Sequence, residues 1–215
     1  MNSFQLYDGV EMPANSFGVY QISKGDCKKS VLTALKAGYR HIDTAQTYFS
    51  EEEVGEAIVE SGIPRKEIFL TTKVWIDHYG EGKTYASVLN SLREFKPDYV
   101  DLILLHQPIA DYYGAYRDLE KIYRERRGRA IGVSNFYPDR LVDICQFSQI
   151  KPMVNQVEIN VFNQQLEAKK WADKYGVLLE AWPPFTEGRN NTFHNETLVE
   201  MAAKHKKSVA QAILR

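Results

Sequence analysis

The chain has 215 residues, of which 44% are hydrophobic and 26% charged, and its 27 Lys and Arg nearly balance 28 Asp and Glu. A net charge of −1 gives no global attraction to nucleic acid or anionic lipid. Two distant cysteines, Cys27 and Cys145, argue against a disulfide scaffold or a zinc cluster. The sequence lacks a signal peptide's apolar core and any run of roughly 18 apolar residues. We therefore expect a cytoplasmic protein without bound metal and without membrane or nucleic-acid partners.

The chain begins with a predicted β-hairpin, because two short apolar segments flank a turn at Asp8 and Gly9. From Phe17 onward, short apolar runs alternate with amphipathic segments, which is typical of βα units on a parallel sheet. The expected strands cover residues 17–22, 40–43, 68–74, 99–106, 130–134, 153–158 and 177–181. The expected helices, with apolar residues at intervals of three and four, cover residues 27–37, 52–61, 85–94, 114–126, 140–147 and 164–174.

Parallel α/β proteins form either closed barrels or open doubly wound sheets, and the open sheets usually carry a Gly-rich loop after the first strand. Here residues 23–26 read Ser-Lys-Gly-Asp, and no G-x-G-x-x-G motif occurs in the chain. The regular units of roughly thirty residues favour a TIM-type (β/α)8 barrel. We expect one α/β domain over residues 1–215, with seven βα units evident.

Reactive residues lie at the carboxyl ends of these strands, where barrel active sites are built. Asp43 ends the second expected strand, Lys73 lies near the end of the third, and His106 ends the fourth. Tyr48 follows Asp43 by five residues and projects over the same end. Singly, Asp43 could cap a helix and His106 could be a core histidine. Ionisable groups that end apolar strands are costly as core filler, so their collection at one end favours a site.

Together, these four residues have the chemistry of a proton-donating site. Tyrosine has a reference pKa of about 10, and we expect the nearby ammonium of Lys73 to lower that of Tyr48. Asp43 would hold Lys73 charged, and His106 would hydrogen-bond the reacting oxygen. A tyrosine that protonates oxygen suggests carbonyl reduction, for which a cofactor must supply a hydride. Further along the strands, groups suited to a carboxamide and a nicotinamide ring are Ser134, Asn135, Gln156 and Trp182.

The sequence closely resembles the aldo-keto reductase family, in the branch that includes 2,5-diketo-gluconate reductase-like and prostaglandin F synthase-like enzymes. The motifs that carry the resemblance are GYRHIDTA at 38–45 followed by Tyr48, TTKVW at 71–75, LLHQP at 104–108, IGVSNF at 131–136 and VNQVE at 154–158. The resemblance implies an NADPH-dependent oxidoreductase that reduces aldehydes or ketones. It also implies a catalytic tetrad of Asp43, Tyr48, Lys73 and His106, with Tyr48 as the proton donor.

For the cofactor, the resemblance implies that Ser134, Asn135 and Gln156 hold the nicotinamide carboxamide while Trp182 stacks on the ring. The partner would be a small carbonyl substrate, and a complete barrel is expected to be a monomer. Some residues depart from the family: Gln107 stands where a Trp is usual, and Pro183 where a Ser is usual. The tetrapeptide at 48–51, Tyr-Phe-Ser-Glu, replaces the usual Tyr-Gly-Asn-Glu.

The C-terminal residues suggest an incomplete barrel. In the family, residues like 211–215 lie within a helix that leads to an eighth strand and to the groups that bind the adenosine 2′-phosphate. The resemblance thus implies a C-terminally incomplete barrel with two unpaired edges. A truncated, noncatalytic barrel is therefore our second hypothesis.

A third hypothesis is nucleotide binding by Lys83. The segment 80–84, Gly-Glu-Gly-Lys-Thr, resembles the end of a phosphate-binding loop but has Asp77 where the first Gly is required. The structural explanation is a solvated loop in which Thr84 caps the next helix. Two basic runs, at 124–129 and 204–207, fit helix C-termini, where cations complement the helix dipole.

Overall fold

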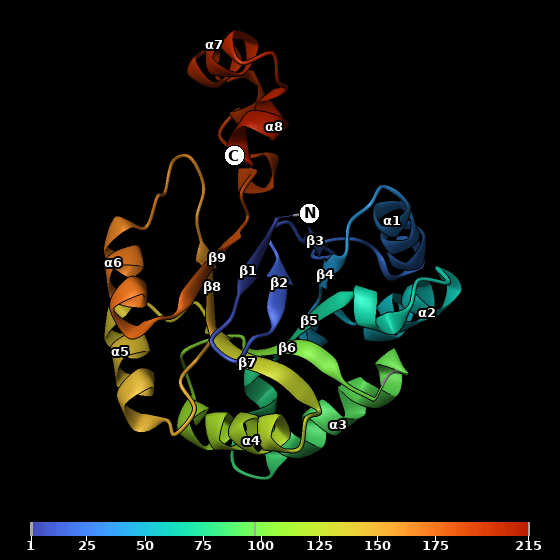
Figure 1. Cartoon of the computed structure of the whole chain (residues 1–215), viewed down its shortest axis with the longest axis vertical. Coiled ribbons are helices and arrows are strands. Elements are labelled where there is room, and N and C mark those ends of the chain that lie inside the picture. Colours follow the sequence, from blue (N-terminus) through green and yellow to red (C-terminus); the bar gives the residue numbers. More distant parts are fainter. Residues whose placement is uncertain (1, 97, 215) are drawn as a thin grey trace.

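A computed structural model describes residues 2–96 and 98–214 of the chain. Within them, seven parallel strands form one curled sheet in which each strand pairs with its neighbours in sequence (Figure 1). The strands are β3 (Phe17–Gly18), β4 (His41–Asp43), β5 (Phe69–Val74), β6 (Val100–Leu105), β7 (Gly128–Ser134), β8 (Val154–Glu158) and β9 (Leu178–Trp182). The predicted α/β barrel architecture with seven βα units is therefore confirmed. The two edge strands of the sheet are β3 and β9.

Six helices connect the strands and lie around the outside of the sheet (Figure 1). They are α1 (Lys24–Lys36), α2 (Glu51–Glu60), α3 (Lys83–Phe95), α4 (Tyr112–Arg124), α5 (Pro138–Phe147) and α6 (Leu166–Tyr175). Apolar side chains from these helices and from the strands form one large buried cluster between the two layers. Burial of this cluster is the main stabilising contribution to the fold. No helix in the described parts of the chain is long and apolar enough to cross a membrane.

After β9 the chain leaves the helical ring. Two further helices, α7 (Glu196–Lys204) and α8 (Val209–Ile213), contact each other and lie apart from α1–α6 (Figure 1). The N-cap residues Asn195 and Ser208 each accept a hydrogen bond from a backbone N–H in the first turn of their helix. These caps satisfy groups that a helix leaves unpaired at its start.

The N-terminal hairpin closes the end of the sheet at which the strands begin. Strands β1 (Ser3–Gln5) and β2 (Glu11–Pro13) pair antiparallel, as the turn at Asp8 and Gly9 predicts. Leu6, Val10 and Met12 are buried against inward-facing residues of the sheet, in a cluster separate from the layer under the helices. Functional groups therefore face the opposite end, where the strands stop.

Several local expectations were wrong, and three have a clear physical reason. The first barrel strand was expected over residues 17–22 but β3 is only Phe17–Gly18, because the chain turns where Ile22 N–H donates to Val19 O and Gln21 has a φ of 63°. Helix α4 begins at Tyr112 rather than residue 114, since the side chain of Asp111 caps it. Helix α3 begins at Lys83 with Gly82 at its N-cap, so Thr84 lies inside the helix and donates to His78 O instead of capping.

Candidate active site

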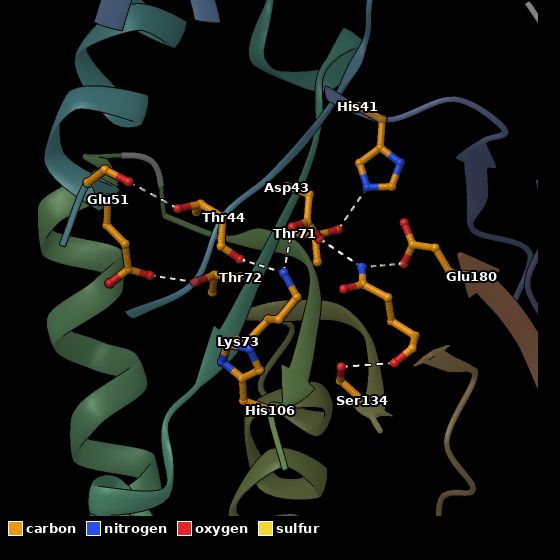
Figure 2. A network of polar contacts seen from close by, with 12 residues as sticks. His41, Asp43, Thr44, Glu51, Thr71, Thr72, Lys73, His106, Ser134 and Glu180 are labelled. Atoms are coloured by element: carbon orange, nitrogen blue, oxygen red, sulfur yellow. Dashed lines mark hydrogen bonds and ion pairs between the residues drawn. The ribbon is translucent and has the colours of Figure 1, made fainter. Parts of the chain in front are cut away.

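A buried ion pair lies at the carboxyl ends of β4 and β5. Lys73, the fifth residue of β5, is 1% exposed, and its Nζ donates to Asp43 Oδ1 at 2.5 Å and to the backbone oxygen of Thr44 at 3.0 Å (Figure 2). Asp43 is the last residue of β4, which places its carboxylate at the strand end. A buried ammonium requires such partners, because an unpaired charge in an apolar interior is very unfavourable.

Tyr48 is the last residue of a short 3-10 helix, η1 (Gln46–Tyr48), that follows β4. The side chain of Gln46 fixes this turn: its amide nitrogen donates to Ser87 and Ser91 on α3, and its oxygen accepts from Trp75 N–H. The Tyr48 ring centroid lies 5.3 Å from Lys73 Nζ. The turn thus holds the phenol beside the buried ammonium.

His106 directly follows β6 and completes this group. Its backbone N–H donates to Val74 O at 3.1 Å, which extends the sheet hydrogen bonding by one residue and fixes the histidine at the strand end. Its ring meets the ring of Tyr48 edge-on at 5.9 Å and that of Trp75 at 5.1 Å. The four residues of the expected tetrad therefore lie together: Asp43, Tyr48 and His106 line one cavity, and Lys73 is buried behind them, against Asp43.

Burial and charge set the protonation of this group. Burial raises the pKa of Tyr48, and although the charge of Lys73 acts to lower it, burial has the larger effect. The expectation that Lys73 lowers the Tyr48 pKa overall was therefore wrong, since the sequence did not show how deeply the phenol is buried. Burial alone would lower the pKa of Lys73, but Asp43, Tyr48 and Glu180 together outweigh burial, so that pKa is raised. Burial, with Lys73, lowers the pKa of His106 to about 4, so its imidazole is neutral at neutral pH.

The residues expected to bind a cofactor lie on the next strands and contact one another. Ser134 Oγ donates to Gln156 O at 2.9 Å, and Asn135 Nδ2 donates to His106 O at 3.0 Å. Trp182, at the end of β9, donates from Nε1 to Asn135 Oδ1 at 3.0 Å. All four line a cavity of about 1020 Å³ together with Asp43, Tyr48 and His106. This volume is at the upper end of the range for cofactor sites.

Gln156 connects the tetrad to the residues expected to bind the cofactor. Its Nε2 donates to Asp43 Oδ2 at 2.9 Å, across the inside of the sheet, and to Glu180 Oε2 on β9 at 3.0 Å (Figure 2). Sequence reasoning did not single out Glu180, which burial and the nearby charge of Asp43 shift to a pKa of about 7. The sequence held a partial signal, an acidic residue within an apolar strand, but the pairing of Glu180 with Gln156 depends on strand register.

The residues that depart from the family also border the cavity. The backbone of Gln107 is held by Tyr79, whose hydroxyl donates to Gln107 O and accepts from its N–H, both at 3.0 Å. Pro183 has no N–H to offer a ligand, and its oxygen accepts from Thr186 N–H at 2.9 Å. Tyr20 and Trp75 supply aromatic surface beside Tyr48 and His106.

Comparisons with known proteins find similar chains over nearly the whole length of this one. A model of the aldo/keto reductase family matches residues 14–215. A glyoxal reductase of Bacillus subtilis is 44% identical over 216 residues, which cover 100% of this chain and 78% of that protein. A 9,11-endoperoxide prostaglandin H2 reductase of Trypanosoma cruzi is 40% identical over 100% of this chain and 77% of its own. An aldo-keto reductase of Bombyx mori, solved in complex with NADP, superposes with a TM-score of 0.93 at 32% identity, covering 99% of this chain and 78% of that one.

Proposed function

Because the chain belongs to the aldo/keto reductase family of NAD(P)H-dependent enzymes, we propose that it reduces an aldehyde or ketone with NADPH and that Tyr48 is the proton donor. The observation that carries this proposal is that Tyr48, His106 and Asp43 line one cavity, with Lys73 buried against Asp43 and beside the Tyr48 ring. A phenol, a buried ammonium and a neutral imidazole at one strand end form a site for protonating a carbonyl oxygen.

The protonation states fit these roles. The raised pKa keeps Tyr48 protonated at neutral pH, as a proton donor must be. As the proton leaves, the phenolate that forms is stabilised by Lys73, which Asp43 holds charged. Neutral His106 donates a hydrogen bond to the same substrate oxygen and orients it. The carbonyl carbon gains a hydride while its oxygen gains the Tyr48 proton, and the product is an alcohol.

The residues around the cavity also fit a nicotinamide cofactor, which supplies the hydride when bound. Ser134 and Gln156 offer a hydroxyl and an amide oxygen to a carboxamide, and Trp182 offers a flat aromatic face. Asn135 holds Trp182 through its side-chain oxygen and so orients this face. NADPH rather than NADH is proposed because the Bombyx mori relative was solved with NADP.

Small dicarbonyl compounds are the substrates we propose. One relative in Bacillus subtilis is a glyoxal reductase, and an Escherichia coli relative at 32% identity is a methylglyoxal reductase. The aromatic residues at the cavity, Tyr20 and Trp75, could pack against a short carbon chain while Tyr48 and His106 meet one of its oxygens.

The test is NADPH oxidation with methylglyoxal by the chain and by two Tyr→Phe variants. Tyr48→Phe removes the proposed proton donor and should lower kcat by about 10²–10⁴-fold. Tyr137→Phe makes the same change on an exposed residue at the start of α5 and should leave kcat unchanged. Equal rates for the Tyr48→Phe variant and the unmodified chain would contradict the proposed role.

A further inference from the structure

Glu180 lies in a row of polar residues that crosses three strands. Ser134 on β7 pairs in register with Gln156 on β8, and Gln156 pairs in register with Glu180 on β9. The three side chains therefore lie on the same face of the sheet. Figure 2 shows the Glu180 carboxylate on the side of the network opposite Lys73, reached through the hydrogen bonds of Asp43 and Gln156.

The amide of Gln156 has two N–H groups and one oxygen, and the structure uses both N–H groups. One donates to Asp43 Oδ2 at 2.9 Å and the other is available to Glu180 Oε2 at 3.0 Å. Above pH 7, where Glu180 is mostly ionised, the oxygens of both carboxylates only accept hydrogen bonds. An amide turned the other way would then face them with its own oxygen and be repelled. Together the two carboxylates fix which way the amide points.

This arrangement leaves the amide oxygen as the one polar atom of the Gln156 side chain that is free for a ligand. No N–H or O–H in the described residues donates to it. Asp43 alone would hold one N–H and oppose a full turn of the amide, but a single hydrogen bond would leave the amide free to swing about its terminal bond, which has a broad torsional preference. The second carboxylate removes this freedom.

We propose that Glu180 is a positioning residue for the nicotinamide ring: it holds the Gln156 amide with its oxygen presented to the NH2 group of the cofactor's carboxamide. The proposal rests on the proposed function, since it requires that a nicotinamide cofactor bind in this cavity. It assigns Glu180 no contact with the substrate or with the reacting atoms.

The test is calorimetric titration with two oxidised ligands that differ at one group. NADP⁺ carries the carboxamide, whereas 3-acetylpyridine adenine dinucleotide phosphate carries an acetyl group that has no NH2 to donate. Glu180→Ala should weaken NADP⁺ binding by about 5–10-fold, the effect of one hydrogen bond. The same variant should change the affinity for the acetylpyridine analogue by less than about twofold.

Two further variants separate positioning from a general structural effect. Glu180→Gln keeps an acceptor oxygen for Gln156 and should recover most of the affinity for NADP⁺. Gln156→Ala removes the group through which Glu180 acts, so adding Glu180→Ala to it should weaken NADP⁺ binding no further. Thermal unfolding of each variant, followed by circular dichroism, checks that the fold is retained.

Each other outcome overturns the proposal in a distinguishable way. Unchanged NADP⁺ affinity in Glu180→Ala would overturn the inference and leave the proposed function standing. Equal losses for both ligands would show that Glu180 acts on the structure of the cavity and not on the carboxamide. Failure of the unmodified chain to bind NADP⁺ or NADPH at all would overturn the proposed function, and the inference with it.

Discussion

Lys73 is a fully charged group inside an apolar sheet, and its surroundings explain why it is tolerated there. Its Nζ donates to the Asp43 carboxylate and to Thr44 O, while the second oxygen of Asp43 accepts from Gln156. Every polar atom of the pair therefore has a partner that is itself fixed by a strand. Removing one partner would leave an uncompensated buried charge, which costs more than the pair contributes.

The cost of leaving one charge of the Lys73–Asp43 pair without its partner should be measurable in a double-mutant cycle. Lys73→Met and Asp43→Leu should each lower the free energy of unfolding by about 3–5 kcal/mol, because each leaves the other charge buried alone. The double variant Asp43→Leu/Lys73→Met should cost clearly less than the sum of the two single variants. Urea unfolding followed by circular dichroism measures all four proteins, and strictly additive losses would contradict the prediction.

At the residue scale, the sequence predicted which groups meet but not their energetics. Asp43, Lys73 and His106 could be placed together because each lies at or near the end of an expected strand, and parallel strands bring their carboxyl ends to one edge. The pKa direction of Tyr48 could not be predicted, since it depends on how deeply the turn after β4 buries the phenol. Glu180 was missed because its importance depends on strand register with Gln156, which periodicity does not show.

At the scale of elements, close backbone contacts determine how the helices sit on the sheet and on one another. Gly55 in α2 lies against the end of α3, where a Cβ at this position would be 2.6 Å from Phe95 O. A Cβ added to Gly25 in α1 would meet no atom within 4 Å outside its own chain neighbours. Gly55 therefore permits the close packing of α2 against α3, whereas Gly25 has no such packing role.

Substituting these two glycines should have opposite effects. Gly55→Ala should destabilise the protein by about 1–3 kcal/mol, because the backbones of α2 and α3 must separate to admit the methyl group. Gly25→Ala should gain about 0.4–1 kcal/mol, since alanine restricts the unfolded chain without a clash. Urea midpoints of both variants test this, and a loss at Gly25 equal to that at Gly55 would count against the packing argument.

The accuracy of the predicted elements also has a physical explanation. The expected strands 68–74, 99–106 and 153–158 match β5, β6 and β8 to within one residue at each end. For β6 the reason is a nearly all-apolar run, typical of a strand buried on both faces. Strand β7 begins at Gly128, earlier than predicted, since Arg129 pairs with the buried Asp101 and so enters the sheet despite its charge. A hydrophobic pattern does not show that a charged residue such as Arg129 has an ion-pair partner.

At the scale of the whole molecule, buried titratable groups make opposing contributions to stability as the pH changes. Burial lowers the pKa of His41 from 6.5 to about 4, so the unfolded chain binds a proton first and stability falls as pH drops through this range. Burial raises the pKa of Glu51 from 4.5 to about 7, so the folded chain binds a proton first and stability rises as pH drops from 7 to 4.5. His106 acts like His41, and Glu180 acts like Glu51.

The free energy of unfolding should therefore vary little between pH 7 and 4.5 in the unmodified chain. Substituting one titratable group at a time should reveal the opposing pH dependences that cancel in it. Glu51→Gln should make the protein lose on the order of 3 kcal/mol over this range, and His41→Gln should make it gain a similar amount. Urea unfolding at pH 7, 5.5 and 4.5 measures the slopes. Parallel profiles for all three proteins would show that these two groups do not set the pH dependence.

The positions of the aromatic side chains also give the molecule an optical consequence. Of the three tryptophans in the chain, Trp75 and Trp182 line the cavity, while Trp171 lies on α6 with its indole N–H on Glu167. Two of the three tryptophan emitters thus lie at the site, Trp75 against His106 and Trp182 held by Asn135. With Trp171 replaced by Phe, both remaining tryptophans line the cavity, and their emission reports directly on ligand binding there.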